Sequence, residues 1–208
     1  MKLWLASSDC DLIARHLSSG VFAGVVTNPA VVAEARRDRA ELFRDIVQIA
    51  PAAWYQLLAG TEKEMLADAE RMIAINPARM RIKVPATRTG LGVIRRLSDQ
   101  NLHIMATCVP TRAWLVLALA AGAKVIAPYS SMLQKRGIAA KAEEVVAMQA
   151  IIDRQGSPAE ILTGLYEATD LPYYAAHGIR SGFIWAKDVD AFLTQPLAEE
   201  AAAGFGGY

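Results

Sequence analysis

Residues 80–87, MRIKVPAT, have the pattern of a buried β-strand that carries one lysine. Ile82 and Val84 flank Lys83, and Pro85 is expected to end the strand because proline lacks the backbone N–H that a sheet requires. A side chain near the end of its strand points into whatever cavity the strands enclose. The stretch therefore predicts a lysine at the edge of a cavity.

Burial has a chemical consequence for this lysine. An ammonium group is costly to bury, so the side chain must lose its proton or find a partner. Desolvation lowers the pKa of a lysine, and a neutral amine attacks a carbonyl carbon to form a Schiff base. The alternative is that Lys83 reaches solvent or forms a salt bridge, and the local pattern alone favours that explanation. Evidence from the rest of the chain is needed to distinguish a nucleophilic Lys83 from one that reaches solvent or forms a salt bridge.

The composition is typical of one globular domain. The chain has 208 residues, 53% of them hydrophobic, and a net charge of +1. Residues 1–208 are therefore predicted to form a single domain with a substantial core. A charge this close to zero does not indicate nucleic acid or an anionic membrane as a partner.

Targeting and metal signals are not found in the sequence. No apolar run reaches the roughly 20 residues of a membrane span, and the apolar N-terminal segment is too short for a secretory signal. Cys10 and Cys108 have neither a disulfide framework nor a metal-binding spacing. We expect a cytoplasmic protein that uses no metal and no cofactor.

Apolar segments with strand character alternate with helical segments along the whole chain. The strands are predicted at residues 3–6, 22–26, 54–58, 80–85, 103–107, 124–129, 160–163 and 182–185. A helix is predicted to start at the turn 27–30 and to continue through 36–50, and another runs from residue 61 to Pro77. The other helices are predicted at 9–17, 90–97, 110–122, 139–153, 169–177 and 188–203, the last with an interruption at Pro196.

The strands are apolar throughout, which is typical of a parallel sheet buried on both faces. Eight strand–helix units predict an α/β protein with a (β/α)8 (TIM) barrel. An open doubly wound sheet is the alternative. Neither a G-x-G-x-x-G motif after the first strand nor a G-x-x-x-x-G-K-[ST] motif occurs in the sequence.

In a barrel, the chemistry is expected at the carboxyl ends of the strands. The residues predicted there are Ala6, Thr27, Asn28, Gln56, Lys83, Thr107, Tyr129, the turn at 164–167, and Trp185. Each has an ordinary structural explanation, such as a helix cap for Thr27 and Asn28. Together, around one lysine, they predict a site.

Several motifs in this order resemble the transaldolase family, most closely the small fructose-6-phosphate aldolase-like transaldolases. They are Leu3-x-Leu5-x-x-Ser8-Asp9, Gly24-Val25-x-Thr27-Asn28-Pro29, Lys83-Val84-Pro85-x-Thr87-x-x-Gly90-Leu91, Ala127-Pro128-Tyr129 and Gly204-Phe205-Gly206. The resemblance covers nearly the whole chain and implies a (β/α)8 barrel with Lys83 as the Schiff-base lysine. It implies that Gln56, Thr107 and Tyr129 hold a catalytic water. Asn28 matches a substrate-binding asparagine, and we expect Thr27 and Trp185 beside it to bind substrate.

The departures from the family pattern concern proton transfer and phosphate binding. Ala6 stands where the family has an aspartate that handles the donor hydroxyl proton, and Val26 replaces a threonine. Met132 and Leu165 are predicted at the phosphate site, and neither side chain can bind a phosphate. Possible substitutes for the lost base are Asp9, Tyr166 and Glu167, and possible residues of a new anion site are Arg88, Arg112, Lys135 and Arg136.

The main hypothesis is a class I transaldolase or aldolase of carbohydrate metabolism, a transferase or lyase that forms a Lys83 Schiff base with a small ketone or aldehyde. Two alternatives stay open. One is a barrel repurposed for a non-sugar carbonyl in specialised metabolism, and the other is a catalytically idle barrel that binds a ligand or serves as a subunit. The resemblance also implies a homo-oligomer, a pentamer or decamer, in which the C-terminal helix reaches a neighbouring subunit.

Overall fold

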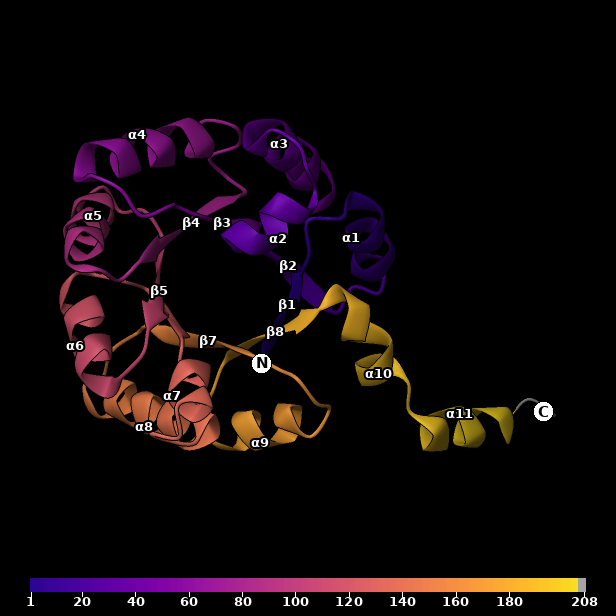
Figure 1. Ribbon diagram of the computed structural model, residues 1–208. Coiled ribbons are helices and arrows are strands. Elements are labelled where there is room, and N and C mark those ends of the chain that lie inside the picture. Colours follow the sequence, from indigo (N-terminus) through magenta and orange to yellow (C-terminus); the bar gives the residue numbers. More distant parts are fainter. Residues whose placement is uncertain (206–208) are drawn as a thin grey trace.

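The lysine-bearing stretch forms β4 (Met80–Pro85), which lies between β3 (Ala53–Gln56) and β5 (Ile104–Val109). The computed structural model describes residues 1–205, and in it eight parallel strands pair in chain order to form a closed barrel (Figure 1). The barrel closes where β1 (Lys2–Ala6) pairs with β8 (Ser181–Trp185). The other strands are β2 (Phe22–Val26), β6 (Val125–Pro128) and β7 (Glu160–Gly164). The predicted (β/α)8 barrel is confirmed.

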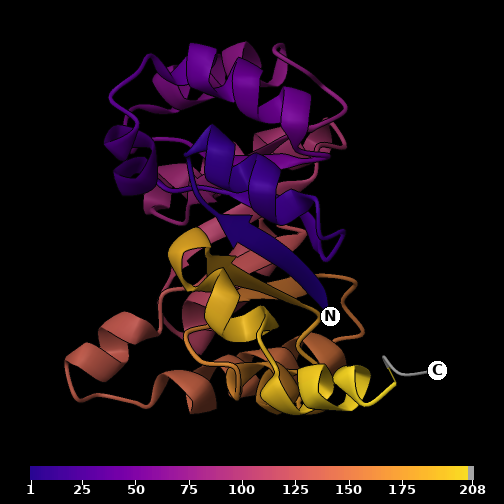
Figure 2. The same ribbon diagram turned by 90° about the vertical axis from the view of Figure 1, so that its right-hand side faces the viewer.

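Helices surround the barrel (Figures 1 and 2). They are α1 (Cys10–Leu17), α2 (Pro29–Glu34), α3 (Arg39–Ile49), α4 (Glu62–Ile73), α5 (Arg88–Asp99), α6 (Arg112–Ala120), α7 (Ser131–Lys135), α8 (Lys141–Arg154), α9 (Asp170–Ala176), α10 (Val189–Leu193) and α11 (Pro196–Ala203), with a 3₁₀ turn at Ala186–Asp188. In Figure 1, α11 lies apart from the barrel, beyond α10. None of the helices within residues 1–205 has the length and apolar character needed to cross a bilayer. Gly206, the last residue of the resemblance motifs, lies outside the described residues.

Side-chain caps explain where several helices begin. The Asp9 carboxylate accepts hydrogen bonds from two backbone N–H groups of α1, and the Asn28 side chain accepts one from Val31 at the start of α2. Thr61 and Glu64 form a capping box at α4. Each cap satisfies N–H groups that have no partner within the helix. The predicted helix starts at these positions are confirmed.

Three local predictions were wrong, and one helix was missed. The expected helix over 36–50 is broken, because Arg36 adopts a left-handed conformation with φ of 50° and Asp38 then caps a new helix, α3. Leu58 lies beyond β3 and is 49% exposed. Pro110 precedes the Thr111 cap of α6 and is not in its first turn. Helix α7 was not expected.

The apolar side chains form two separate layers. The larger layer lies between the strands and the helices, and the smaller one fills the barrel interior. The interior layer contains Trp4 and Trp54, whose rings meet edge to face at 5.9 Å, together with Met105, Val125 and Leu162. Because these side chains fill the barrel interior, a ligand site is expected at the carboxyl-terminal ends of the strands.

Gly90 in α5 provides a test of how the helix packs against the lysine strand. A Cβ atom at Gly90 would lie 1.8 Å from the Pro85 carbonyl oxygen, whereas one at Gly92, two residues later, would meet only the Glu62 carboxylate at 3.8 Å. We expect Gly90→Ala to lower the free energy of unfolding by roughly 1–3 kcal/mol, the usual cost of overpacking. The matched control Gly92→Ala should raise it by about 0.5–1 kcal/mol, because alanine is the better helix former. Urea unfolding of both variants measures the difference, and equal effects would contradict the close contact.

Candidate active site

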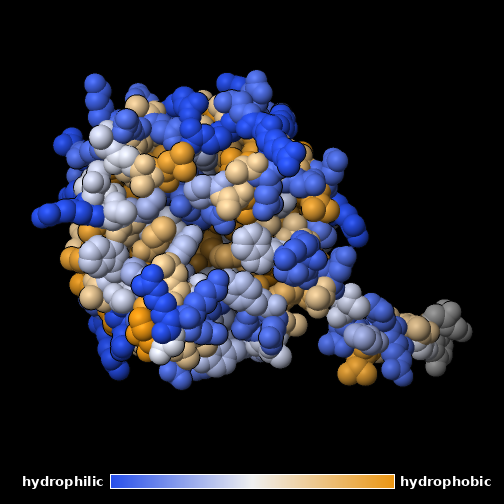
Figure 3. Space-filling view, in the orientation of Figure 1, coloured by the Kyte–Doolittle hydropathy of each residue, from blue (hydrophilic) through white to orange (hydrophobic). Residues whose placement is uncertain are grey.

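A cavity of about 170 Å³ lies at the carboxyl-terminal end of the strands. Figure 3 shows the hollow at the centre of the face seen in Figure 1. The residues that line it are Ala6, Val26, Thr27, Asn28, Val31, Lys83, Met105, Thr107, Ala127, Pro128, Tyr129, Ser131, Lys141, Leu162, Gly164, Tyr166, Phe183 and Trp185. Of the seven predicted site residues, six line this cavity. Gln56 is the exception.

Lys83 is the most deeply buried charged group of the site. Lys83 is only 6% exposed, and its Nζ atom donates a hydrogen bond to the Thr27 carbonyl oxygen at 2.7 Å. Burial lowers the pKa of Lys83 to about 8. An amine with this pKa is partly neutral near physiological pH and can therefore act as a nucleophile.

The turn between β2 and α2 places Thr27 and Asn28 at the cavity. The Thr27 hydroxyl donates to the Trp54 carbonyl oxygen at 2.9 Å, and the Asn28 Oδ1 atom accepts from the Val31 N–H at 3.0 Å. Both side chains thus form hydrogen bonds within the fold and also line the cavity. The Asn28 amide nitrogen is the part of this turn that remains for a ligand, because its oxygen caps the helix.

Gln56, Thr107 and Tyr129 come from three different strands or strand ends. Gln56 pairs in register with Lys83, and Thr107 pairs with Pro85. Within residues 1–205, Gln56 Oε1 and Thr107 Oγ1 are buried atoms with no hydrogen-bond partner. Burial raises the pKa of Tyr129, and the neighbouring Thr107 hydroxyl acts in the opposite direction. Tyr129 is therefore a neutral proton donor at physiological pH.

Cys108 was missed as a neighbour of the site. It follows Thr107 at an irregularity in the β5–β6 register and has a left-handed φ of 58°, which is uncommon for a residue other than glycine. Burial raises the pKa of the Cys108 thiol, and the nearby Lys83 amine opposes this. The thiol therefore stays protonated and does not supply a counter-charge to Lys83.

Ala6 and Trp185 pair in register at the ends of β1 and β8 and line the cavity from one side. A second cavity of about 590 Å³ also touches Ala6, Val31 and Trp185, but it opens toward α1 and does not include Lys83. Since the buried Lys83 amine lies in the smaller cavity, we assign the candidate site to that one. A larger side chain at position 6 would occupy the boundary between the two cavities.

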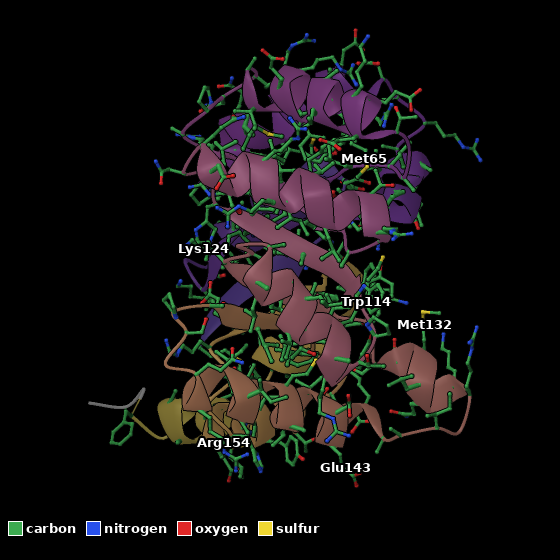
Figure 4. All side chains as sticks on the ribbon, turned by 90° about the vertical axis from the view of Figure 1, so that its left-hand side faces the viewer. Met65, Trp114, Lys124, Met132, Glu143 and Arg154 are labelled. Carbon is green, nitrogen blue, oxygen red and sulfur yellow. The ribbon has the colours of Figure 1, made fainter. Side chains whose placement is uncertain are left out.

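The expected phosphate-site positions do not face the cavity. Leu165 is fully buried in the outer apolar layer, and Met132 is 45% exposed on α7, which projects beyond the neighbouring helices (Figure 4). Their chain neighbours Tyr166 and Ser131 line the cavity in their place. None of the four cations suggested for a new anion site lines it. Lys141, which the sequence analysis did not single out, does.

Of the residues suggested to replace the missing base, only Tyr166 lines the cavity. The Asp9 carboxylate caps α1, and Glu167 is exposed at the surface. Burial raises the pKa of Tyr166, with Asp170 acting in the same direction. A phenol of raised pKa is a poor base, so Tyr166 does not replace a carboxylate in this role.

The comparisons with known proteins agree on one family. Residues 3–171 match the family described as Transaldolase/Fructose-6-phosphate aldolase. A probable transaldolase of Caulobacter vibrioides is 30% identical over 163 residues, which cover 78% of this chain and 74% of that protein. A probable transaldolase of Alkaliphilus metalliredigens is 28% identical over 207 residues, covering 99% and 96%. A probable fructose-6-phosphate aldolase of Streptococcus pneumoniae is 28% identical over 217 residues, covering 99% and 94%.

The buried amine predicts a stability change that does not depend on any substrate. Because the folded state lowers the Lys83 pKa from 10.5 to about 8, the unfolded chain binds more protons between these values, and the native state is penalised most below pH 8. We expect Lys83→Met to raise the free energy of unfolding at pH 7 by on the order of 1–3 kcal/mol. The gain should shrink as the pH rises from 8 to 10.5.

Chemical denaturation of both proteins at pH 7 and pH 10 measures this gain. Lys135→Met removes an exposed lysine of α7 and serves as the control, with little change expected. A Lys83→Met protein that is no more stable than the wild type at pH 7 would show that the amine is not desolvated.

Proposed function

Because this chain belongs to the transaldolase/fructose-6-phosphate aldolase family, we propose that it is a Schiff-base enzyme whose Lys83 forms an imine with a small ketone or aldehyde. The observation that carries the proposal is the buried Lys83 amine, with its lowered pKa, in a cavity at the carboxyl end of a (β/α)8 barrel. The volume of about 170 Å³ is below the roughly 300–1,000 Å³ of pockets for drug-sized ligands, which favours a short-chain compound.

The proposed chemistry begins with attack of the neutral Lys83 amine on the substrate carbonyl carbon. A C–N bond forms as the carbonyl π bond breaks, the nitrogen gives up a proton while the oxygen takes one up, and the resulting carbinolamine loses water to give the imine. Tyr129 is the proposed proton donor. A water between the Thr107 and Tyr129 hydroxyls, which both line the cavity, would relay these protons and would give the buried Thr107 Oγ1 atom a partner. Gln56 does not line the cavity, but it pairs in register with Lys83, and its buried Oε1 atom is the proposed further acceptor for this water.

Cleavage of a carbon–carbon bond needs a further base for the donor hydroxyl. Ala6 cannot act as one, and the cavity lining within residues 1–205 contains no Asp or Glu. We therefore propose that imine and enamine chemistry is retained while ordinary transaldolase activity is weak. Met132 and Leu165 face away from the cavity, which supports a preference for substrates without phosphate.

An idle barrel is the competing hypothesis. It explains Ala6, but it does not explain why Lys83 is buried at the ligand cavity with no carboxylate partner within residues 1–205, an arrangement that costs stability. Binding without chemistry would not require a nucleophile there.

Reductive trapping tests the imine. We expect cyanoborohydride with hydroxyacetone or dihydroxyacetone to add one reduced substrate to the wild type, detected by intact mass. Lys83→Met should abolish the adduct, whereas Lys135→Met should not change it. Between pH 6.5 and 9 the initial trapping rate should rise with a midpoint near 8, because the neutral amine is the nucleophile. A normal adduct in Lys83→Met, or none with any carbonyl compound in the wild type, would rule the proposal out.

Ala6 is the position at which cleavage is expected to be recovered. A carboxylate here would face the same cavity as Lys83, so Ala6→Asp should raise retro-aldol turnover of fructose 6-phosphate or a simpler ketose by at least ~10-fold, a fraction of the roughly 10²–10⁴-fold that a well-placed general base contributes. Ala6→Asn is the matched control, since it has nearly the same shape but accepts no proton. The new charge also favours protonated Lys83, so trapping is measured separately. Normal trapping without any gain in cleavage would show that the lost base is not the limiting defect.

We also propose that the chain is a homo-oligomer. Helix α11 lies apart from the barrel, and Leu197 and Phe205 are 72% and 73% exposed. Apolar side chains on a projecting segment are typical of a contact between subunits. Light scattering at micromolar concentration should give the mass of a multimer, and Leu197→Asp should lower it. A wild-type monomer would contradict the proposal.

A further inference from the structure

The cavity has an unbalanced set of ionisable groups. Among the residues that line it, the titratable side chains are Lys83, Tyr129, Lys141 and Tyr166. Within residues 1–205, no carboxylate contributes to the lining. The cavity therefore offers two amines and two neutral hydroxyls, and it offers no negative charge to a ligand.

Lys141 is held in a defined position at this cavity. It is the first residue of α8, and its Nζ atom donates a hydrogen bond to the Gly164 carbonyl oxygen at 2.7 Å. The same atom lies 4.2 Å from the centre of the Tyr166 ring and 5.5 Å from that of Tyr174. One carbonyl and two aromatic faces orient the ammonium group but do not neutralise it.

No carboxylate within residues 1–205 forms a salt bridge with Lys141. Asp170 is the carboxylate whose charge acts on Lys141. Its Oδ2 atom already accepts hydrogen bonds from the Tyr166 and Glu167 backbone N–H groups. Burial lowers the pKa of Lys141 to about 8, and Asp170 opposes this shift. Lys141 is therefore mostly protonated at pH 7, half-buried, and left with N–H donors that a ligand can use.

A partly desolvated ammonium without a counter-ion binds an anion favourably, because the anion supplies charge and hydrogen-bond acceptors at once. Lys141 is the only cationic side chain besides Lys83 in the lining described above. Since Lys83 is the proposed nucleophile, the anion of a substrate would be left to Lys141.

We propose that Lys141 binds the carboxylate of a short-chain carbonyl substrate whose carbonyl carbon reacts with Lys83, an assignment that rests on the function proposed above. A carboxylate is favoured over a phosphate for two reasons. The cavity has a volume of only about 170 Å³, and among the described residues no arginine lines it to engage several phosphate oxygens in a bidentate manner. The substrate class is thus a small oxo acid.

The test compares two three-carbon ketones that differ in one end group. Pyruvate carries a carboxylate where hydroxyacetone carries a neutral hydroxymethyl group. The concentration of each ketone that gives half-maximal reductive trapping at Lys83 is measured in the wild type, in Lys141→Met, and in Lys135→Met as the control that also removes one positive charge. Dihydroxyacetone phosphate is the phosphate probe.

In Lys141→Met, the half-saturating concentration of pyruvate is expected to rise roughly 10- to 100-fold, the range for a hydrogen bond to a charged group. Hydroxyacetone should change by no more than about twofold, and Lys135→Met should leave both values unchanged. Equal trapping of pyruvate in the wild type and in Lys141→Met overturns the inference. A Lys141 dependence seen with dihydroxyacetone phosphate and not with pyruvate overturns the assignment to a carboxylate.

A second measurement uses only the wild type, so it does not depend on the folding of a variant. Lactate, which has the carboxylate but no carbonyl to react, should compete with hydroxyacetone for trapping, and its failure to compete would also overturn the inference. If hydroxyacetone is trapped at Lys83, the proposed Schiff-base function stands whether or not lactate competes. If no ketone is trapped at Lys83, the proposed function fails and this inference fails with it.

Discussion

The burial of the Lys83 amine inside a closed barrel is the constraint on which the rest of the site depends. Within residues 1–205, the one hydrogen-bond acceptor for the Lys83 amine is the Thr27 carbonyl oxygen, and the amine loses most of its hydration. The protein tolerates the group because β4 is held between two parallel neighbours and because α5 packs directly against the end of the strand at Gly90. The same desolvation that lowers stability makes the amine a nucleophile near neutral pH.

The barrel interior sets the depth of the site. Trp4, Trp54, Met105 and Leu162 fill the barrel interior, and the cavity that contains Lys83 lies at the carboxyl-terminal ends of the strands. The turn after β2 then serves two purposes, since Thr27 and Asn28 complete hydrogen bonds of the fold and also line the cavity. The shape of the cavity and the stability of the fold are therefore coupled through the same few residues.

The charge distribution of the cavity separates this chain from a sugar aldolase equipped with a carboxylate base. With Ala6 at the end of β1, the cavity lining within the described residues has amines and hydroxyls but no acid. Such a site is suited to forming an imine and to attracting an anion, and it is poorly suited to removing a proton from a hydroxyl group. The Cys108 thiol does not change this balance, because burial keeps it protonated.

The sequence by itself determined the barrel and the position of its lysine, because strand periodicity, proline positions and helix caps are local properties of the chain. It also identified Thr27, Asn28, Thr107, Tyr129 and Trp185, since parallel strands of a barrel bring all their carboxyl ends to one face. Which neighbouring side chain faces the cavity was decided only by tertiary structure. A shift of one residue turns a side chain to the opposite side of the chain, so Ser131 and Tyr166 line the cavity while Met132 and Leu165 do not. Lys141 reaches the site from a helix distant in sequence from Lys83, and its burial depends on the Gly164 carbonyl and two aromatic rings, which no local pattern reveals.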